Sequence, residues 1–151
     1  MMIRQIRADD ISQIITIEHE SFHNPYPEDI ITFLYERYRT TFLVAEQGGT
    51  VLGYIAGITS WREGHIVSLA VLPAWRRKGI ASQLVEELYR IFRKYGKKRV
   101  KLEVRLSNKA AIALYENLGF ERRKIVKKYY EDGEDAVMMK KRLEENAKNL
   151  E

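Results

Sequence analysis

The chain has 151 residues, of which 45% are hydrophobic and 11% aromatic, so it is long and apolar enough for about one folded domain. It contains no cysteine, which excludes disulfides, zinc–thiolate sites and a thiol nucleophile, and which is typical of a reducing cytoplasm or of a protein adapted to heat. The net charge of +5 is uneven: residues 1–75 carry −4 and residues 76–151 carry +9. The second half is therefore expected to meet an anion: nucleic acid, an acidic lipid headgroup or a phosphorylated cofactor.

Neither a membrane span nor a signal peptide is predicted. The longest run without a charged residue, residues 47–61, is interrupted by glycines and is shorter than the roughly 18 residues that a spanning helix needs. Four charged residues lie within the first ten positions, where a signal peptide would have an apolar stretch. We therefore expect a soluble, cytoplasmic protein.

The first forty residues predict one strand and two helices. Residues 3–7 favour a short strand, and Asp9 or Asp10 can cap the helix that follows. The apolar positions of this helix recur at helical spacing: Ile11, Ile14, Ile15 and Phe22. Residues 22–27 contain two prolines and two aromatic residues, and Pro27 suits the first turn of a second helix. A proline-flanked aromatic loop thus joins two helices.

The middle of the chain predicts a hairpin, a buried strand and a long helix. Residues 42–45 and 51–56 are apolar and flank Gly48-Gly49, as in a β-hairpin. Residues 66–71 are almost continuously apolar, which is typical of a central strand. After Pro73, an amphipathic helix begins near Ile80 and ends before Gly96.

The last third predicts a strand, a helix and a closing hairpin. Residues 98–106 favour a strand, and the next helix can be capped by Asn108 and ended by Gly119. Two strands around the favoured turn Asp132-Gly133 end near Leu143, so residues 1–143 are predicted to form a single domain, with 144–151 as a frayed polar tail. This order predicts a three-layer mixed α/β fold.

The turn between the buried strand and the long helix is the candidate anion site. Three consecutive cations and a glycine precede a helix start, whose unpaired backbone N–H groups point outward with the positive end of the helix dipole. The predicted contacts are Arg76, Arg77, Lys78, Gly79, Ile80, Ala81 and Ser82. The alternative is a solvated turn with an ordinary turn glycine. The glycine and lysine patterns of Walker-type and dinucleotide-binding loops are absent.

Two motifs carry a family resemblance that spans nearly the whole chain. They are Arg76-x-x-Gly79-x-Ala81 after an apolar strand, and Asn108-x-x-Ala111-x-x-Leu114-Tyr115-x-x-x-Gly119-Phe120 after the next strand. Together they resemble the GCN5-related N-acetyltransferase (GNAT) family. The resemblance implies a mixed, mostly antiparallel sheet of six to seven strands with about four helices.

The same resemblance implies acetyl-CoA as co-substrate. Its diphosphate would lie at the turn of residues 76–82 and its pantetheine along Leu69, Ala70 and Val71, with Asn108 and Tyr115 on the cofactor side. In the family, adjacent central strands splay there, and a backbone N–H near Val71 would face the thioester oxygen as an oxyanion donor.

The charged residues Lys101, Glu103 and Arg105 alternate with apolar residues in a strand that should be interior. The charged side chains are therefore expected to face an open slot or the sheet edge. The alternative is an ordinary half-exposed strand. Glu103-Val104-Arg105-x-Ser107-Asn108 with Leu114-Tyr115 resembles the RimI-type and NatA-catalytic-subunit-like N-terminal acetyltransferases. In that subgroup Glu103 would take a proton from the amine, directly or through water, and Tyr115 would protonate the departing CoA sulfur. For Tyr115, the alternative is a core aromatic.

Five further residues are predicted to contact the acceptor substrate. The two loops of this subgroup that clasp a peptide correspond to the segments containing Phe22 and Tyr26 and containing Tyr129 and Tyr130; the alternative is loop packing. His65 could share the proton relay with Glu103 or be a surface histidine. His19 and His23 have no metal-ligand spacing to a carboxylate or cysteine, so no metal is expected.

These observations favour transfer of acetyl groups from acetyl-CoA to the N-terminal α-amino groups of proteins or peptides. Transfer to lysine or a small amine is the second hypothesis, and a basic nucleic-acid-binding module is the third. The third hypothesis is weakened because the basic residues from Lys97 onward lack interleaved stacking aromatics. The basic half could dock the enzyme on a ribosome, and the sequence leaves the oligomeric state open.

Overall fold

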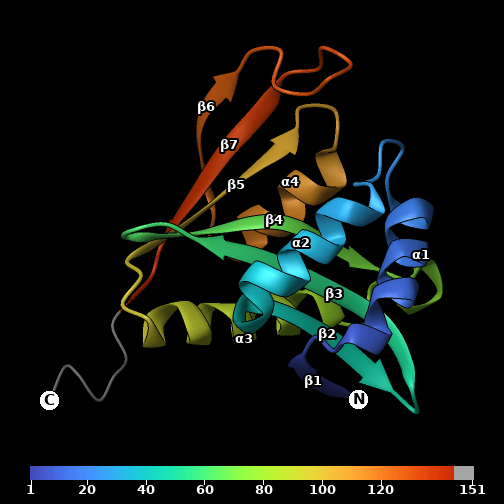
Figure 1. Cartoon of the computed structure of the whole chain (residues 1–151). Helices are drawn as coiled ribbons and strands as arrows, with labels where there is room; N and C mark the ends of the chain where they lie inside the picture. Colours follow the sequence, from blue (N-terminus) through green and yellow to red (C-terminus); the bar gives the residue numbers. More distant parts are fainter. Residues whose placement is uncertain (145–151) are drawn as a thin grey trace, which may run out of the picture.

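A seven-stranded sheet forms the frame of the computed structural model, which describes residues 1–144 (Figure 1). Its spatial order is β1-β2-β3-β4-β5-β7-β6, and every neighbouring pair is antiparallel except β4 and β5. The strands are β1 (Met2–Gln5), β2 (Phe42–Gln47), β3 (Thr50–Thr59), β4 (Glu63–Val71), β5 (Arg99–Arg105), β6 (Glu121–Val126) and β7 (Ala136–Arg142). The predicted mixed, mostly antiparallel sheet is confirmed.

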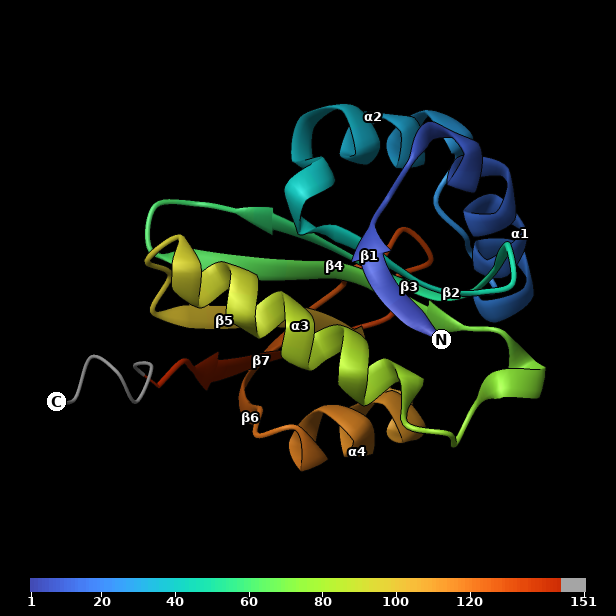
Figure 2. The same cartoon turned by 90° about the horizontal axis from the view of Figure 1, so that it is seen from below.

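Two helices cover each face of this sheet, as Figure 2 shows. They are α1 (Ile11–Ser21) and α2 (Glu28–Tyr38) on one face, and α3 (Ile80–Lys94) and α4 (Lys109–Asn117) on the other. Short 3₁₀ turns occupy Ala8–Asp10, Arg39–Thr41 and Pro73–Trp75. The three predicted layers are therefore confirmed. None of the described helices is both long enough and apolar enough to cross a membrane.

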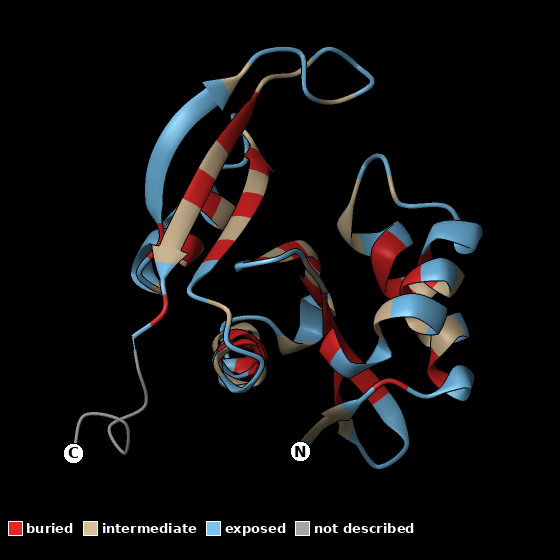
Figure 3. Cartoon of the chain, turned by 60° about the vertical axis from the view of Figure 1, so that its left-hand side comes forward, coloured by how far each residue is buried: buried red, intermediate tan, exposed pale blue. Residues whose placement is uncertain are grey.

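Each face of the sheet has its own hydrophobic core. Leu84, Leu88 and Phe92 of α3 are fully buried against the sheet, because they recur every three or four residues on one side of the helix. The second core lies under α1 and α2. Figure 3 shows the buried residues on the inward sides of the elements, whereas β6 at the sheet edge is largely exposed. The cores hold the central strands from both sides.

The sheet divides between β4 and β5. These parallel strands pair only at Glu63 with Arg99, Gly64 with Val100 and His65 with Lys101. Beyond His65, β4 stays with β3, whereas β5 stays with β7 along its whole length, and Figure 1 shows the two strands separating. The divergence, as we call the region between residues 66–71 and 102–105, has the splayed arrangement that the resemblance implies.

Local details differ from the prediction at two places. Asp10 precedes α1 without capping it, because its carboxylate accepts hydrogen bonds from the Arg7 backbone N–H and the Arg4 side chain instead. Asp132-Gly133 does not form a two-residue hairpin turn, since β6 and β7 are joined by residues 127–135. The predicted tail lies outside the described residues apart from Glu144.

Candidate active site

The β5 side of the divergence carries the charged residues that alternation predicted. Val100, Leu102 and Val104 are buried in the core, and the three side chains between and after them, Lys101, Glu103 and Arg105, are half-buried on the opposite face. A strand alternates its side chains between two faces, so one strand serves both the core and the divergence.

Glu103 and His65 form a close pair where the strands begin to separate. Nε2 of His65 lies 2.6 Å from Oε2 of Glu103, and Nζ of Lys101 lies 3.9 Å from Oε1. Burial opposes ionisation of Glu103, but the hydrogen bond and charge of His65, together with the charge of Lys101, lower the pKa of this carboxyl below its usual value. His65 is thus engaged with Glu103 rather than being an isolated surface histidine, and the pair can carry a proton.

The β4 side presents backbone groups to the divergence. The N–H of Leu72 donates to the carbonyl of Leu52 on β3, and alternation then turns the peptide groups of Val67, Leu69 and Val71 away from β3. Two contacts confirm this direction: Tyr26 Oη donates to the Val67 carbonyl at 3.3 Å, and Arg76 Nε donates to the Val71 carbonyl at 2.9 Å. The Val71 N–H therefore faces the region where an oxyanion donor is expected.

The turn before α3 has the geometry of an anion site. Gly79 precedes the helix with φ +82°, in the left-handed region, and no side chain caps the first turn, so its N–H groups are free of side-chain acceptors. A Cβ at Gly79 would meet only Nε2 of Gln83, at 3.9 Å, so the backbone is open to close approach. These residues fit the diphosphate of CoA.

The predicted anion contacts are not equivalent. Arg77, Lys78 and Gly79 are exposed, and Ala81 and Ser82 are half-buried. Arg76 is also exposed, and its guanidinium donates to the Val71 carbonyl at 2.9 Å and to Ser21 Oγ at 3.3 Å. The side chain of Ile80 is buried in the core, so only its backbone N–H is available.

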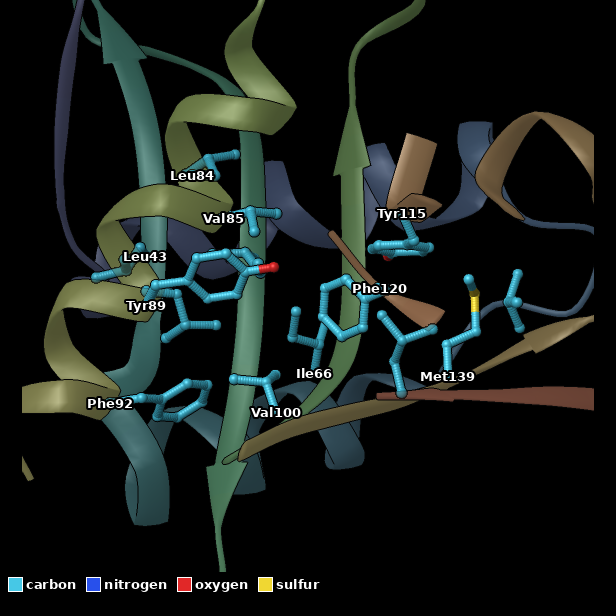
Figure 4. Packing of buried hydrophobic residues seen from close by; sticks show 14 of the residues in the cluster. Leu43, Ile66, Leu84, Val85, Tyr89, Phe92, Val100, Tyr115, Phe120 and Met139 are labelled. Carbon is cyan, nitrogen blue, oxygen red and sulfur yellow. The ribbon is translucent and has the colours of Figure 1, made fainter. Parts of the chain in front are cut away.

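Tyr115 and Asn108 lie on α4 as predicted. Asn108 caps the helix, because its Oδ1 accepts from the Ala111 N–H at 3.1 Å. Tyr115 is 8% exposed and meets Phe120 edge to face with 5.5 Å between ring centres (Figure 4). Burial, assisted by Tyr130, raises the pKa of the Tyr115 phenol above its usual value, so this side chain keeps its proton at neutral pH.

Arg105 anchors the loop between β6 and β7. Its Nη1 donates to Asp132 Oδ2 at 2.8 Å and to Glu134 Oε1 at 2.9 Å, and its guanidinium lies 4.1 Å from the ring centre of Tyr130. Tyr129 packs edge to face on Tyr130, with ring centres 5.0 Å apart. Arg105 lies two positions after Glu103 on β5. Through Tyr130 and the loop carboxylates, it holds both predicted substrate tyrosines in place.

Three tyrosines gather around Glu103. Burial, with the charges of Glu103 and Tyr26, raises the pKa of Tyr129; burial, with the charges of Glu18 and Glu103, raises that of Tyr26. Burial chiefly raises the pKa of Tyr130 to about 12. The two loops predicted to hold the acceptor are thus brought together at the divergence. Among the predicted contacts, Phe22 is half-buried and packs against the core under α1 and α2.

The sequence reasoning missed a buried polar cluster beside this site: Glu18, Tyr54 and Ser68. A signal was present, because Ile11, Ile14 and Phe22 define an apolar stripe in which position 18 also falls. A carboxylate in that stripe, with a serine inside an otherwise apolar central strand, indicates a buried hydrogen-bonded pair.

Comparison with known proteins assigns the family. The model of the acetyltransferase (GNAT) family matches residues 8–120. The chain belongs to this family. An N-alpha-acetyltransferase of Saccharolobus solfataricus is 40% identical over 154 residues, covering 93% of this chain and 92% of the relative. GNAT membership makes the chain an acyltransferase, and the third hypothesis, a nucleic-acid-binding module, is set aside.

Solved structures share the same fold. The crystal structure of Ard1 from Thermoplasma volcanium superposes with a TM-score of 0.91 at 30% identity, covering 95% of this chain and 98% of that one. The ribosomal-protein-S18-alanine N-acetyltransferase from Escherichia coli superposes with a TM-score of 0.85 at 32% identity, covering 99% and 98%.

Proposed function

We propose that this GNAT enzyme transfers the acetyl group of acetyl-CoA to the N-terminal α-amino group of proteins or peptides in the cytoplasm. The observation that carries the proposal is the His65–Glu103 pair at the start of the divergence, surrounded by loop tyrosines. The N-alpha-acetyltransferase from Saccharolobus solfataricus supports this acceptor class, since it is similar over almost the whole chain.

The residues fit a direct transfer within a ternary complex. Acetyl-CoA supplies the thioester; the amine nitrogen forms a bond to its carbonyl carbon as the carbon–sulfur bond breaks. The turn at residues 76–82 would bind the diphosphate, and the Val71 N–H would donate to the carbonyl oxygen. Glu103 takes the amine proton, directly or through water and shared with His65, and the Tyr115 phenol gives its proton to the sulfur.

Proton energetics favour an α-amine over lysine. An α-amino group titrates at about 7.7 to 8.0 and lysine at about 10.4, so deprotonation at pH 7 costs about 1 to 1.4 kcal/mol for the former and roughly 4.6 kcal/mol for the latter. Glu103 is a weak base, because its pKa is lowered, and it is ionised at neutral pH. Because the α-amine needs little help to lose its proton, an ionised carboxylate held by His65 at 2.6 Å is sufficient to accept it.

A ribosomal protein is one candidate acceptor in this proposal. The structural relative from Escherichia coli is named for acetylating ribosomal protein S18 at an alanine. Arg122, Arg123 and Lys124 are exposed along β6 at the sheet edge, within the basic half of the chain. They would favour docking on the ribosome through its RNA phosphates.

The test uses two peptides of equal length with acetyl-CoA. One begins with a free serine, alanine or methionine and contains no lysine; the other has a blocked amino terminus and one internal lysine. We expect CoA release and a mass increase of one acetyl group on the first peptide only. Acetylation of the second peptide alone, or of small amines in place of either, would replace this proposal by the lysine or small-amine hypothesis.

A further inference from the structure

Glu18 is a buried carboxylate that the proposed chemistry does not use. It lies near the end of α1 and is 1% exposed. Its Oε1 accepts from the hydroxyls of Tyr54 and Ser68, the latter at 2.7 Å, and its Oε2 accepts from the Tyr26 backbone N–H at 2.9 Å. The two hydroxyls also lie 2.9 Å apart. Each of these three hydrogen-bond donors is a neutral group.

A carboxylate in this position needs a reason beyond packing. Burial of an ionised group is costly unless donors satisfy it, and a well-packed apolar side chain of similar volume is often no less stabilising. Position 18 belongs to the apolar stripe of α1, where such a residue would fit. We therefore expect Glu18 to hold the groups that donate to it in a fixed arrangement.

The contacts of Glu18 close a ring at the edge of the divergence. From Oε2 the ring runs to the Tyr26 N–H, through the Tyr26 side chain to the Val67 carbonyl, along β4 to Ser68, and from Ser68 Oγ back to Oε1. Val67 follows His65 by two residues, at the point where β4 leaves β5. The ring thus ties the α1–α2 loop to the strand that faces Glu103.

Tyr26 connects this ring to the reacting groups. It is 40% exposed, and the charges of both Glu18 and Glu103 act on its phenol. None of the partners of Glu18 named above belongs to the anion turn of residues 76–82. A change at Glu18 is therefore expected to move Tyr26 and leave the acetyl-CoA contacts in place.

We propose that Glu18 is a positioning residue for the acceptor: it holds Tyr26 across the mouth of the divergence, so that an incoming peptide amino terminus is directed to Glu103 and His65. This inference rests on the proposed function. Glu18 acts through Tyr26 and takes no proton from the substrate. Its contribution belongs to acceptor binding and not to the acetyl-transfer step.

The main test compares Glu18→Gln with Glu20→Gln, an exposed glutamate of the same helix. The amide keeps the size of Glu18 but replaces one acceptor oxygen by a donor, so either the Tyr26 N–H or the hydroxyl pair loses its acceptor. For Glu18→Gln we expect the KM for the peptide to rise about tenfold, kcat to change less than about threefold, and the calorimetric Kd for acetyl-CoA to stay unchanged. Glu20→Gln should match the wild type in all three.

Three further measurements keep the test decisive. Tyr54→Phe removes one hydrogen-bond donor to Glu18 but keeps the aromatic side chain. It should raise the peptide KM by a smaller factor than Glu18→Gln, and it serves as the test if Glu18→Gln folds poorly. Combined with Tyr26→Phe, Glu18→Gln should raise KM by less than the product of the two single effects, because both act through Tyr26. Amide exchange at Tyr26 should be faster in Glu18→Gln.

The outcomes separate this inference from the proposed function. If the wild type acetylates the free-terminus peptide but Glu18→Gln keeps the wild-type peptide KM, or loses kcat alone, Glu18 is not a positioning residue while the function stands. If the wild type acetylates no peptide amino terminus, the proposed function fails, and this inference fails with it.

Discussion

The two loops that flank the divergence are anchored by opposite means. A buried carboxylate with neutral donors holds the α1–α2 loop at Tyr26, whereas the cation Arg105, paired with Asp132 and Glu134, holds the β6–β7 loop. The Glu18 anchor is shielded from solvent, but the Arg105 anchor lies near the surface, where water and salt weaken ion pairs. The anchor at Glu18 is therefore expected to withstand salt, whereas the anchor at Arg105 is expected to weaken as the salt concentration rises.

Glu103 lies between these two anchors, and its replacement should have the largest effect. Glu103→Gln removes the proton acceptor while retaining size, so kcat/KM for the peptide should fall about 10²- to 10³-fold. The loss should be greatest below pH 7.5, where the amine is protonated. Steady-state rates from pH 6 to 9 measure this, with the exposed Glu121→Gln as control. An equal loss at every pH would contradict the proposed role.

Tyr115→Phe should have the next largest effect. Because the buried phenol holds its proton and is expected to give it to the sulfur, its loss should lower kcat about 10- to 100-fold and leave the KM values for both substrates nearly unchanged. Tyr89→Phe, in the same core, controls for the loss of a buried hydroxyl. A wild-type kcat in Tyr115→Phe would remove the acid role.

Arg105→Lys tests the difference between the two anchors. Lysine keeps the charge but loses the fork geometry and the stacking on Tyr130, so the peptide KM should rise about two- to fivefold at low salt. In 1 M NaCl the gap from the wild type should shrink, whereas the effect of Glu18→Gln should persist. Equal salt sensitivity of the two variants would contradict the difference between the two anchors.

The smallest expected effect is a loss of stability of the β6–β7 loop at low pH. The hydrogen bonds from Ser107 and the Arg105 side chain lower the pKa of Glu134 from 4.5 to about 2. A lowered carboxyl pKa stabilises the folded loop above about pH 4.5, and this contribution is lost as the pH falls toward 2. The amide signal of Ser107 should therefore titrate near pH 2 by NMR, and the transition should vanish in Glu134→Gln. A midpoint near 4.5 would contradict the anchor.

Features set by short-range spacing could be predicted from the sequence. The turn before α3 needs only a strand, Gly79 and a helix start within a few residues, and the Asn108 cap needs only Ala111 three residues later. The placement of Glu103 follows from alternation along a single strand. Each of these depends on backbone periodicity, which the sequence displays directly.

Features set by tertiary packing could not be read in this way. His65 and Glu103 are 38 residues apart, and Glu18 and Ser68 are 50 apart, so their contacts depend on how the strands and helices assemble. The sequence alone left His65 with two interpretations. Asp132-Gly133 favoured a tight hairpin, but the ion pairs with Arg105 and the hydrogen bond that the Ser107 N–H donates to Glu134 stabilise a longer loop.

The central claim is that one peptide amino terminus and acetyl-CoA meet between β4 and β5. Its most direct test is calorimetric binding of a conjugate in which the amino terminus of a short peptide is joined through an acetyl linker to the sulfur of CoA. The account predicts a Kd at least about a hundredfold below that of CoA alone, because one molecule then fills both sites. A conjugate that binds no more tightly than CoA would contradict it.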